Sequence, residues 1–467
     1  EWLESNGVYI SENSGWGDAP HPLALSSETR DEDSLEFSGR GLVFRKPVSD
    51  GDKLIDLPFS LCMTKEASQN TFGKSAITDG TSEYIAIALL LIHERYILGE
   101  ASFWWPYINI LPETSEVNPS FTWTEEELKL LEGSPALVSA LSLRAKVEGE
   151  YDTLRQGIFA RHAQTFDPEE VYTYERFEWA FTMLFSRAVR LDALAEGPQV
   201  ALVPYADLVN HTPFSTAYIT AEVGADGWFG QKDEDKVVVI ADRSFKAMEQ
   251  FYISYGQKSN AELLLLYGFS LDRNPFNSVE ISVGLAPGDS LYDEKLEFIK
   301  NSGQGLPDGT GFTFPLYIDR YPNELLECLR VLCITSEELT RPDGSRAALS
   351  NLQATMFVSE ENEVNVFEAL IEACQATLDR YPNSEKDDAA LMKDRSMFTI
   401  LPMNTRNAIR LRRTEKRLLR RTIATAERRI EELRSGELDL EGLDLTIPNK
   451  KFIIDDLISP GAQSWLQ

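Results

Sequence analysis

The chain has 467 residues, 43% of them hydrophobic, and a formal net charge of −30 at pH 7. This length predicts two or three domains rather than one core, and so acidic a chain repels nucleic-acid phosphate unless a local basic patch overrides its field. The four cysteines form no CxxC pair, which excludes the common zinc modules and indicates a reducing compartment.

No segment is expected to cross a membrane, because the longest apolar run, 84–92, is far shorter than a bilayer span. The first residue is Glu1 rather than Met. We therefore expect that an upstream targeting peptide or another segment has been removed.

Short strands and turns are expected over 1–75, including a turn at Asp50–Gly51 between two strands. A helical pattern starts near Thr81 and continues to about 191, with a break at 133–135. Its last part, 173–191, is apolar nearly all round, which predicts a buried helix.

Strand-like segments return over 200–256, and a helix is expected over 260–267 because Gly268 is a helix stop signal. Strands therefore flank a helical insertion of roughly a hundred residues, and no strand–helix alternation predicts a doubly wound sheet. The sequence contains neither GxGxxG after a strand nor a phosphate-binding GxxxxGK[ST], which disfavours a Rossmann-type nucleotide site.

From about residue 290 the chain is predicted to be mostly helical, and its last long helix starts at Asn407. The apolar residues of that helix follow one stripe, while Arg and Lys crowd the other faces. Such a basic face is either solvated or docks against a partner or against acidic surface of this chain.

The segment "YADLVNHTP" (205–213) holds one of the four histidines, His211, directly after Asn210 and near Asp207. A nucleophilic triad lacks its G-x-S-x-G serine or a paired cysteine, and a metal site lacks further histidines, since the other three lie in unrelated segments. A buried Asn-His pair that satisfies backbone groups in a turn remains an alternative.

A second segment, "EQFYISYGQKSNAELLLLYGF" (249–269), supplies tyrosines. Tyr252 and Tyr255 are three residues apart, so they need a bend or a strand end to share a site. Phenols around a slot supply weakly polar oxygens without fixed charge and walls that exclude water, and this environment suits a cationic group that must be deprotonated and then methylated.

Taken together, these segments resemble the SET-domain protein methyltransferases, in the branch typified by the plant Rubisco large-subunit lysine methyltransferase. The resemblance covers nearly the whole chain, and "LRVLCITSEEL" (329–339) is also similar to the animal actin-histidine branch. The motifs that carry it are "GRGLVF" (39–44), "FWWPYINILPE" (103–113), "FSRAV" (185–189), "VPYADLVNHT" (203–212), "AY" (217–218) and the tyrosine segment.

The resemblance implies an α+β fold: a pseudo-knotted SET domain of short β-sheets with a helical insertion, followed by an all-α C-terminal domain. The expected boundaries are 1–80 and 175–290 for the split SET domain, 81–174 for the insertion, and 291–467 for a helical substrate-binding-like domain.

By position, the resemblance also implies the site residues and an S-adenosylmethionine cofactor, with S-adenosylhomocysteine as product. Tyr255 matches the family's catalytic tyrosine. The cofactor would contact Ser38, Gly39, Arg40, Arg187, Asn210 and His211. The channel for the substrate amine would be lined by Ser186, Asp207, Tyr218 and Tyr267 together with Tyr255. No metal is implied.

The implied function is protein-lysine N-methylation of a protein substrate, with no nucleic-acid site or membrane span and, from the plant relatives, a chloroplast stroma location. A desolvated channel lowers the pKa of lysine from its usual 10.4, and the neutral amine then attacks the methyl carbon in line. Val189 and Leu191 stand where the plant enzyme has an aromatic residue and an arginine. Two alternatives therefore stay open: a weakly active or inactive SET-fold subunit of a larger assembly, and transfer to histidine.

Overall fold

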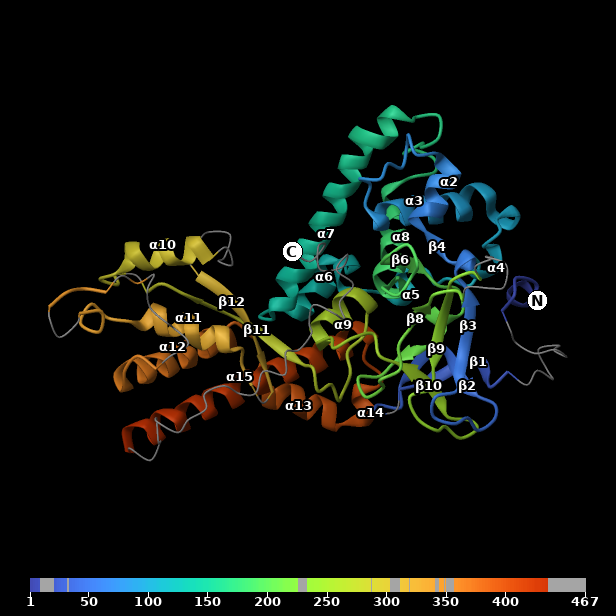
Figure 1. Cartoon of the computed structure of the whole chain (residues 1–467). Coiled ribbons are helices and arrows are strands. Elements are labelled where there is room, and N and C mark those ends of the chain that lie inside the picture. Colours follow the sequence, from blue (N-terminus) through green and yellow to red (C-terminus); the bar gives the residue numbers. More distant parts are fainter. Residues whose placement is uncertain are drawn as a thin grey trace.

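Two unequal parts make up the fold in this computed structural model (Figure 1). Short sheets and the helices α2 to α9 form the larger part, and the smaller part contains β11, β12 and the helices α10 to α15. The structure describes residues 1–8, 21–31, 33–225, 233–286, 288–302, 311–318, 320–340, 344–347, 349 and 357–435. The end of the predicted C-terminal domain, 436–467, lies outside these ranges.

Three small sheets form the β part of the larger body. The first has the order β1-β2-β10-β7, in which β10 pairs antiparallel with β2 and parallel with β7. The other two have the orders β3-β9-β8 and β4-β6-β5. The strands are β1 (Leu23–Arg30), β2 (Phe37–Phe44), β3 (Lys53–Pro58), β4 (Met63–Thr64), β5 (Val189–Leu191), β6 (Gln199–Leu202), β7 (Asn210–His211), β8 (Thr220–Glu222), β9 (Lys236–Ile240) and β10 (Gln250–Ile253).

The parallel β7–β10 pair is the topological feature that assembles the site. It aligns Tyr252 with Asn210 and Ile253 with His211, although the two strands are about forty residues apart in sequence. Parallel strands need a crossover connection, and here residues 212–249 supply it while also forming β8 and β9. The two segments singled out in the sequence are therefore neighbours in one sheet.

Helices cover one side of these sheets and carry a second apolar core. The long apolar run 84–92 lies within α3, and its side chains are all buried, as expected for a helix that is hydrophobic all round. Ser134 caps α7 through its hydroxyl and Pro135 is its first residue, which explains the predicted break. These helices are α1 (Trp2–Ser5), α2 (Lys65–Phe72), α3 (Glu83–His93), α4 (Trp105–Ile108), α5 (Thr114–Val117), α6 (Glu125–Leu128), α7 (Pro135–Leu154), α8 (Tyr174–Arg187) and α9 (Asn260–Tyr267).

The C-terminal part has its own core, in which α12 and α15 pack together and against the β11–β12 pair. The N-terminal half of α15 reaches back to the larger body, where Arg410 bridges Glu36 and Asp272. Its elements are β11 (Ser278–Gly284), α10 (Tyr292–Ser302), β12 (Gly311–Tyr317), α11 (Asn323–Cys333), α12 (Glu360–Leu378), α13 (Glu385–Lys393), α14 (Arg395–Phe398) and α15 (Met403–Ser435).

The expected α+β class with a helical C-terminal region is confirmed, and two details are corrected. The C-terminal domain is not all-α, because β12 pairs antiparallel with β11 along its whole length. The predicted helix 173–191 ends at Arg187, and Val189–Leu191 instead forms β5 against β6. Pairing with another strand decides both differences, because β12 pairs with β11 and β5 pairs with β6. Residues 436–437 of the last predicted helix lie outside the described ranges.

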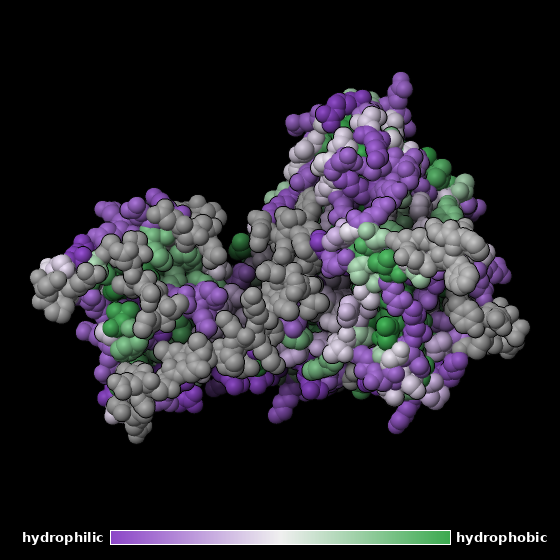
Figure 2. Space-filling model, viewed as in Figure 1, coloured by the Kyte–Doolittle hydropathy of each residue, from purple (hydrophilic) through white to green (hydrophobic). Residues whose placement is uncertain are grey.

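Hydrophilic side chains cover much of the face drawn in Figure 2, and the surface is hollowed between the C-terminal part and the larger body. Apolar side chains gather on the C-terminal part and over the sheets of the larger body in this view.

Candidate active site

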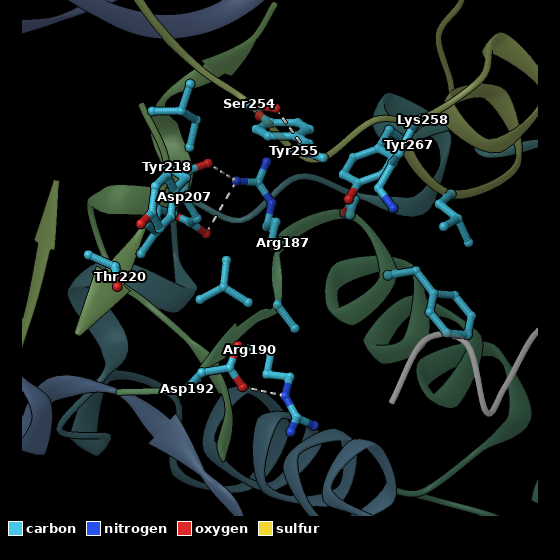
Figure 3. A pocket seen from close by; sticks show the side chains of 18 of the residues that line it. Arg187, Arg190, Asp192, Asp207, Tyr218, Thr220, Ser254, Tyr255, Lys258 and Tyr267 are labelled. Atoms are coloured by element: carbon cyan, nitrogen blue, oxygen red, sulfur yellow. Dashed lines mark hydrogen bonds and ion pairs between the residues drawn. The ribbon is translucent and has the colours of Figure 1, made fainter. Parts of the chain in front are cut away.

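A cavity of about 440 Å³ lies where the end of α8, β5, the segment before β8, the segment after β10 and α9 meet. Figure 3 shows polar and aromatic side chains from these elements turned toward a common space. Six of the predicted site residues line this cavity: Ser186, Arg187, Asp207, Tyr218, Tyr255 and Tyr267.

Tyr255 enters the cavity because it lies just beyond the end of β10. Tyr252, inside the strand, points elsewhere and donates its hydroxyl to the carbonyl of Arg30 at 3.1 Å. The strand end therefore separates the two tyrosines, and Tyr252 does not line the cavity.

The hydroxyl of Tyr255 donates a 2.7 Å hydrogen bond to the carbonyl of Val209. Burial raises the pKa of this phenol well above its usual value, so the group stays protonated at neutral pH. Its ring stacks between His211 and Tyr267, with centroid distances of 5.0 Å to each. Tyr255 thus offers a fixed, neutral oxygen whose proton is already committed, and it does not act as a base.

Asp207 is the buried carboxylate of the cavity, with a side chain that is 1% exposed, whereas the second one, Asp192, is exposed and pairs with Arg190. Oδ2 of Asp207 accepts a 2.7 Å hydrogen bond from the hydroxyl of Tyr107 and lies 3.3 Å from Nη1 of Arg187, which also donates to the Asp207 carbonyl at 3.1 Å. Burial raises the pKa of Asp207, whereas Arg187 and Tyr107 pull it down, and the net direction is upward. Oδ1 has no hydrogen-bond partner within the described ranges.

Arg187 is held by the side-chain and backbone oxygens of Asp207. Burial lowers the pKa of its guanidinium, but the charge of Asp207 raises it, with a net rise. Arg187 therefore stays charged and its charge is matched by Asp207. Ser186, one residue earlier, donates its hydroxyl to the Thr182 carbonyl at 2.6 Å in its own helix.

Tyr218 occupies the open side of the cavity, where it is 55% exposed. It comes from the segment that precedes β8. The predicted channel residues are thus brought together, but Tyr218 lies at the mouth rather than within the buried part.

The predicted cofactor residues form a second group around the hydroxyl of Thr29. Thr29 Oγ1 donates to the Gly39 carbonyl at 2.9 Å and lies 3.0 Å from Ser38 Oγ. Asn210 Nδ2 donates to Thr29 Oγ1 at 3.2 Å and to the Arg40 carbonyl at 3.1 Å. This network joins β1, β2 and β7, and none of Ser38, Gly39, Arg40 and Asn210 lines the cavity.

The close approach of β2 and Asn210 requires a glycine in the "GRG" motif. A Cβ at Gly41 would lie 2.5 Å from Asn210 Nδ2 and 2.9 Å from the Thr29 methyl group, which is too close for real side-chain atoms. Gly41 therefore explains why this motif can hold Asn210.

His211 connects the two groups. Its Nδ1 accepts a hydrogen bond from the Tyr255 backbone N–H at 3.1 Å, so the proton of the neutral ring resides on Nε2. Burial lowers the pKa of His211 to about 4, which keeps the ring neutral at pH 7. Nε2 has no partner among the residues described.

Sequence reasoning assigned no role to Tyr107, Lys258 or Thr29. Tyr107 lies in the motif "FWWPYINILPE" and Lys258 lies in the tyrosine segment, so both residues belong to motifs that carry the family resemblance. Neither spacing nor composition reveals which side chain reaches the cavity, and Thr29 belongs to no quoted motif.

The comparisons with known proteins agree with this geometry. Residues 286–419 match the model of the Rubisco LSMT substrate-binding family. The SET domain of LSMT bound to lysine and AdoHcy (S-adenosylhomocysteine) superposes with a TM-score of 0.72 and 28% identity, covering 97% of this chain and 96% of that chain. Rubisco LSMT bound to AdoMet (S-adenosylmethionine) gives 0.71 and 26%, with 97% of both chains covered.

This chain is similar to LSMT along nearly its whole length and has the fold of the LSMT SET domain. Curated relatives include the actin-histidine N-methyltransferases of Callithrix jacchus and Homo sapiens, each 29% identical over 409 residues, or 84% of this chain. The LSMT-like chain spans 64% of the length of these relatives.

The expected location in the chloroplast stroma is contradicted by these relatives, which are animal proteins. That expectation rested on the plant resemblance alone, and nothing in the composition required it. The predicted domain boundaries and the roles of the site residues stay predictions.

Within the described ranges no helix combines the length and apolar character that a membrane span needs. The same residues contain no group of three or more His, Cys, Asp or Glu side chains placed to hold a metal ion.

Proposed function

We propose that this LSMT-like protein is an S-adenosylmethionine-dependent protein methyltransferase that modifies lysine in a protein substrate. The observation that carries the proposal is the convergence of Asp207, Tyr255 and Tyr267, from three separate segments, on one cavity beside the Thr29–Asn210 network. A related SET domain binds lysine and AdoHcy. The chain matches only part of the curated relatives, so the activity is a proposal rather than a transfer of their names.

The residues near Asn210 fit such a cofactor. A Cβ at Gly39 would meet nothing within 4 Å, which leaves open space beside the network. Gln250 Nε2 and His211 Nε2 are buried donors without partners among the described residues, and buried donors of this kind require an acceptor. A ligand rich in carboxylate, hydroxyl and ring-nitrogen acceptors supplies those partners.

The bound cofactor would supply an electrophilic methyl group, and the chain's own residues would prepare the nucleophile. The stacked rings of His211, Tyr255 and Tyr267 exclude water from one wall of the cavity. The fixed oxygens of Tyr255 and Val209, joined by a 2.7 Å hydrogen bond, would serve as acceptors for a polarised methyl or an N–H. Alignment of the nucleophile with the methyl group and removal of water from the cavity would therefore account for the rate enhancement, without a covalent intermediate.

Lysine is the favoured target because of Asp207. One of its oxygens, Oδ1, has no partner among the described residues, and a buried carboxylate oxygen with a free lone pair suits an incoming ammonium. Arg187 balances the Asp207 charge in the absence of substrate. Asp207 would favour the entering ammonium, whereas burial would lower the pKa of the bound lysine toward the neutral, reactive amine, whose proton leaves to solvent before transfer.

Histidine is the second candidate target, because the curated relatives are named actin-histidine N-methyltransferases. A neutral imidazole already has a lone pair at pH 7 and needs no carboxylate to admit it. A third possibility is a SET-fold subunit of a larger assembly with little or no transfer activity, for which Val189 and Leu191 were the reason in the sequence.

The test is incubation with methyl-labelled S-adenosylmethionine and a protein extract, followed by mass spectrometry of the labelled residue. We expect labelled lysine, and at least a tenfold loss in Tyr255→Phe. Tyr151→Phe is the matched control, because Tyr151 also donates its hydroxyl to a buried carbonyl, that of Tyr172 at 2.9 Å, but lies outside the cavity. Labelled histidine would replace the lysine assignment.

Calorimetry with S-adenosylhomocysteine separates the remaining outcomes. Cofactor binding without any labelled protein, and with Tyr255→Phe equal to wild type, would support the scaffold function. Absence of cofactor binding would overturn the methyltransferase proposal itself. Asp207→Asn, which keeps the shape of the side chain and removes its charge, is expected to reduce transfer to lysine more than transfer to histidine.

A further inference from the structure

The cavity contains a buried lysine that the proposed chemistry does not use. Lys258 lies in the turn between β10 and α9, lines the same cavity as Asp207 and Tyr255, and is 4% exposed. Figure 3 shows its side chain running beside Tyr267. Its Nζ lies 6.0 Å from the centroid of the Tyr267 ring.

The backbone of this turn is firmly held. Ser259 and Glu262 form a capping box at the start of α9, and Asn274 Nδ2 donates to the Lys258 carbonyl at 2.8 Å. The backbone position from which the Lys258 side chain extends is therefore set by the fold rather than by a loose loop.

No residue in the described ranges forms a salt bridge or hydrogen bond with the Lys258 ammonium. Glu262 attracts it, but that carboxylate already accepts hydrogen bonds from the Ser259 N–H at 2.7 Å and hydroxyl at 2.9 Å. Of the two carboxylates that line the cavity, Asp207 is bound by Arg187 and Tyr107, and Asp192 is bound by Arg190 at 2.6 Å. Burial consequently lowers the pKa of Lys258.

Other buried lysines of the chain show what a satisfied site contains. Lys295, 1% exposed, has Asp289 at 2.6 Å and the Leu332 carbonyl at 2.7 Å. Lys416, 2% exposed, has Asp388 at 2.7 Å and the Asn383 carbonyl at 2.9 Å. A buried ammonium without such partners is costly, so Lys258 differs from both in lacking an anion.

We propose that Lys258 is a carboxylate-binding residue of the cavity, whose missing counter-charge is brought in by the ligands. This inference rests on the proposed methyltransferase function. Two carboxylates can fill the role: the one on the amino-acid end of the cofactor, and an acidic side chain that flanks the target residue in the protein substrate. Either would pair with Lys258 and restore the electrostatic balance that Lys295 and Lys416 have internally.

Whether the cofactor supplies the carboxylate is tested by calorimetry with two probes. These are S-adenosylhomocysteine and 5′-methylthioadenosine, and the second lacks the amino-acid carboxylate. If the cofactor supplies the anion, Lys258→Met weakens S-adenosylhomocysteine binding at least tenfold and leaves 5′-methylthioadenosine binding unchanged, and Lys258→Arg recovers most of the loss. Lys246→Met, the same change at an exposed lysine, is the control and should match wild type.

Whether the protein substrate supplies the carboxylate is tested with acceptor peptides that carry Glu or the isosteric Gln at each position flanking the target residue. If the substrate supplies the anion, wild type methylates one Glu peptide at least tenfold better than its Gln counterpart, and Lys258→Met removes the preference. If wild type methylates the Glu and Gln peptides equally, the substrate source is overturned without the variant, so this arm of the test does not depend on the folding of Lys258→Met.

The inference is overturned if Lys258→Met binds both probes as wild type does and wild type treats Glu and Gln peptides alike. In that case cofactor binding and transfer by wild type would still support the proposed function. If wild type itself neither binds S-adenosylhomocysteine nor transfers methyl groups, the proposed function fails and this inference fails with it.

Discussion

The hydroxyl of Tyr107 donates a 2.7 Å hydrogen bond to Oδ2 of Asp207, although the two residues are one hundred positions apart. Tyr107 belongs to α4 in the helical insertion, and Asp207 to the short turn that precedes β7. Arg187, at the end of α8, binds the same carboxylate. The insertion therefore contributes directly to the electrostatics of the cavity through a residue that does not itself line it.

Tyr107→Phe is expected to lower methyl transfer while leaving the fold intact. A hydrogen bond to a charged group contributes about 1.5–3 kcal/mol, which corresponds to roughly a ten- to hundredfold change in rate if the interaction is needed in the transition state. Tyr107 also pulls the pKa of Asp207 down, so its loss should raise that pKa and move the acid limb of the pH–rate profile to higher pH. The measurement is kcat/KM across pH.

Tyr96→Phe is the matched control for this prediction. Tyr96 lies in the same insertion and contacts Arg95 and Arg176 through its ring, which phenylalanine retains. It should behave as wild type. A Tyr107→Phe protein with reduced activity but an unshifted acid limb would show that Tyr107 acts through packing rather than through Asp207.

Sequence patterns predicted the parts of the site that are contiguous in the chain. The helix α9 was expected over 260–267 and is found there, because its capping serine and its terminal Gly268 are local features. Asn210, His211 and Tyr255 were grouped correctly as neighbours through the family motifs, and the β7–β10 pairing supplies the physical reason. Their roles in binding and catalysis remain to be measured.

The sequence could not supply the relationships that depend on distant packing. Nothing near Tyr107 indicates Asp207, and the uncompensated charge of Lys258 is defined by partners that are absent from its surroundings. The β11–β12 pair is different, because "SVEISVG" alternates between partly buried or exposed and buried positions along the strand. That period of two is typical of a half-buried strand, so the local pattern indicates β11, whereas its pairing with β12 depends on a partner about thirty residues away.

Stability should fall as the pH drops from 6.5 to 4, partly because of His211. Its pKa is about 4 in the folded protein, owing to burial, and about 6.5 when unfolded. Between these values the unfolded chain binds a proton that the folded chain does not, so the free energy of unfolding decreases as the pH falls. The full effect is roughly 3 kcal/mol at about 1.4 kcal/mol per pKa unit.

Urea unfolding at several pH values tests this expectation with His211→Asn, whose amide oxygen can still accept from the Tyr255 N–H. The variant should be less stable at pH 7 and should lose less stability on acidification than wild type. Burial also lowers the pKa of His21, so part of the slope will remain. If the free energy of unfolding changes equally with pH in the two proteins, the assignment to His211 is contradicted.

Glu415 is expected to act in the opposite direction. It is buried where the insertion meets α15, and it accepts hydrogen bonds from Ser134 and Tyr381, each at 2.9 Å. Burial raises its pKa to about 7, so between about 4.5 and 7 the folded state holds a proton that the unfolded state has lost. The contribution of Glu415 to the free energy of unfolding therefore decreases as the pH rises from about 4.5 to about 7.

The variant Glu415→Gln removes this titration and keeps an acceptor oxygen. We expect Glu415→Gln to gain stability relative to wild type as the pH rises from 5 to 8, by roughly 2–3 kcal/mol from the size of the shift. The difference in the free energy of unfolding between the two proteins reports on Glu415 and not on the histidines, because both proteins contain the same histidines. A difference that stays constant with pH would mean that Glu415 is ionised throughout.

Gly268 should be among the least replaceable residues near the cavity. It ends α9 directly after Tyr267 with a φ of +78°, and a Cβ there would lie 1.8 Å from the Val117 carbonyl oxygen. Gly268→Ala must therefore shift the end of α9 or the end of α5. Since Tyr267 stacks on Tyr255, that shift would also disturb the aromatic wall of the cavity.

Gly288→Ala separates the two causes of this cost. Gly288 also has a positive φ, +88°, but its Cβ would meet nothing within 4 Å, so only the backbone strain of about 1–2 kcal/mol applies. Gly268→Ala adds a steric term of about 1–3 kcal/mol and should lower methyl transfer as well, whereas Gly288→Ala should retain it. Denaturant unfolding and turnover measured on both variants test the comparison, and equal losses of stability would show that the Val117 carbonyl yields without cost.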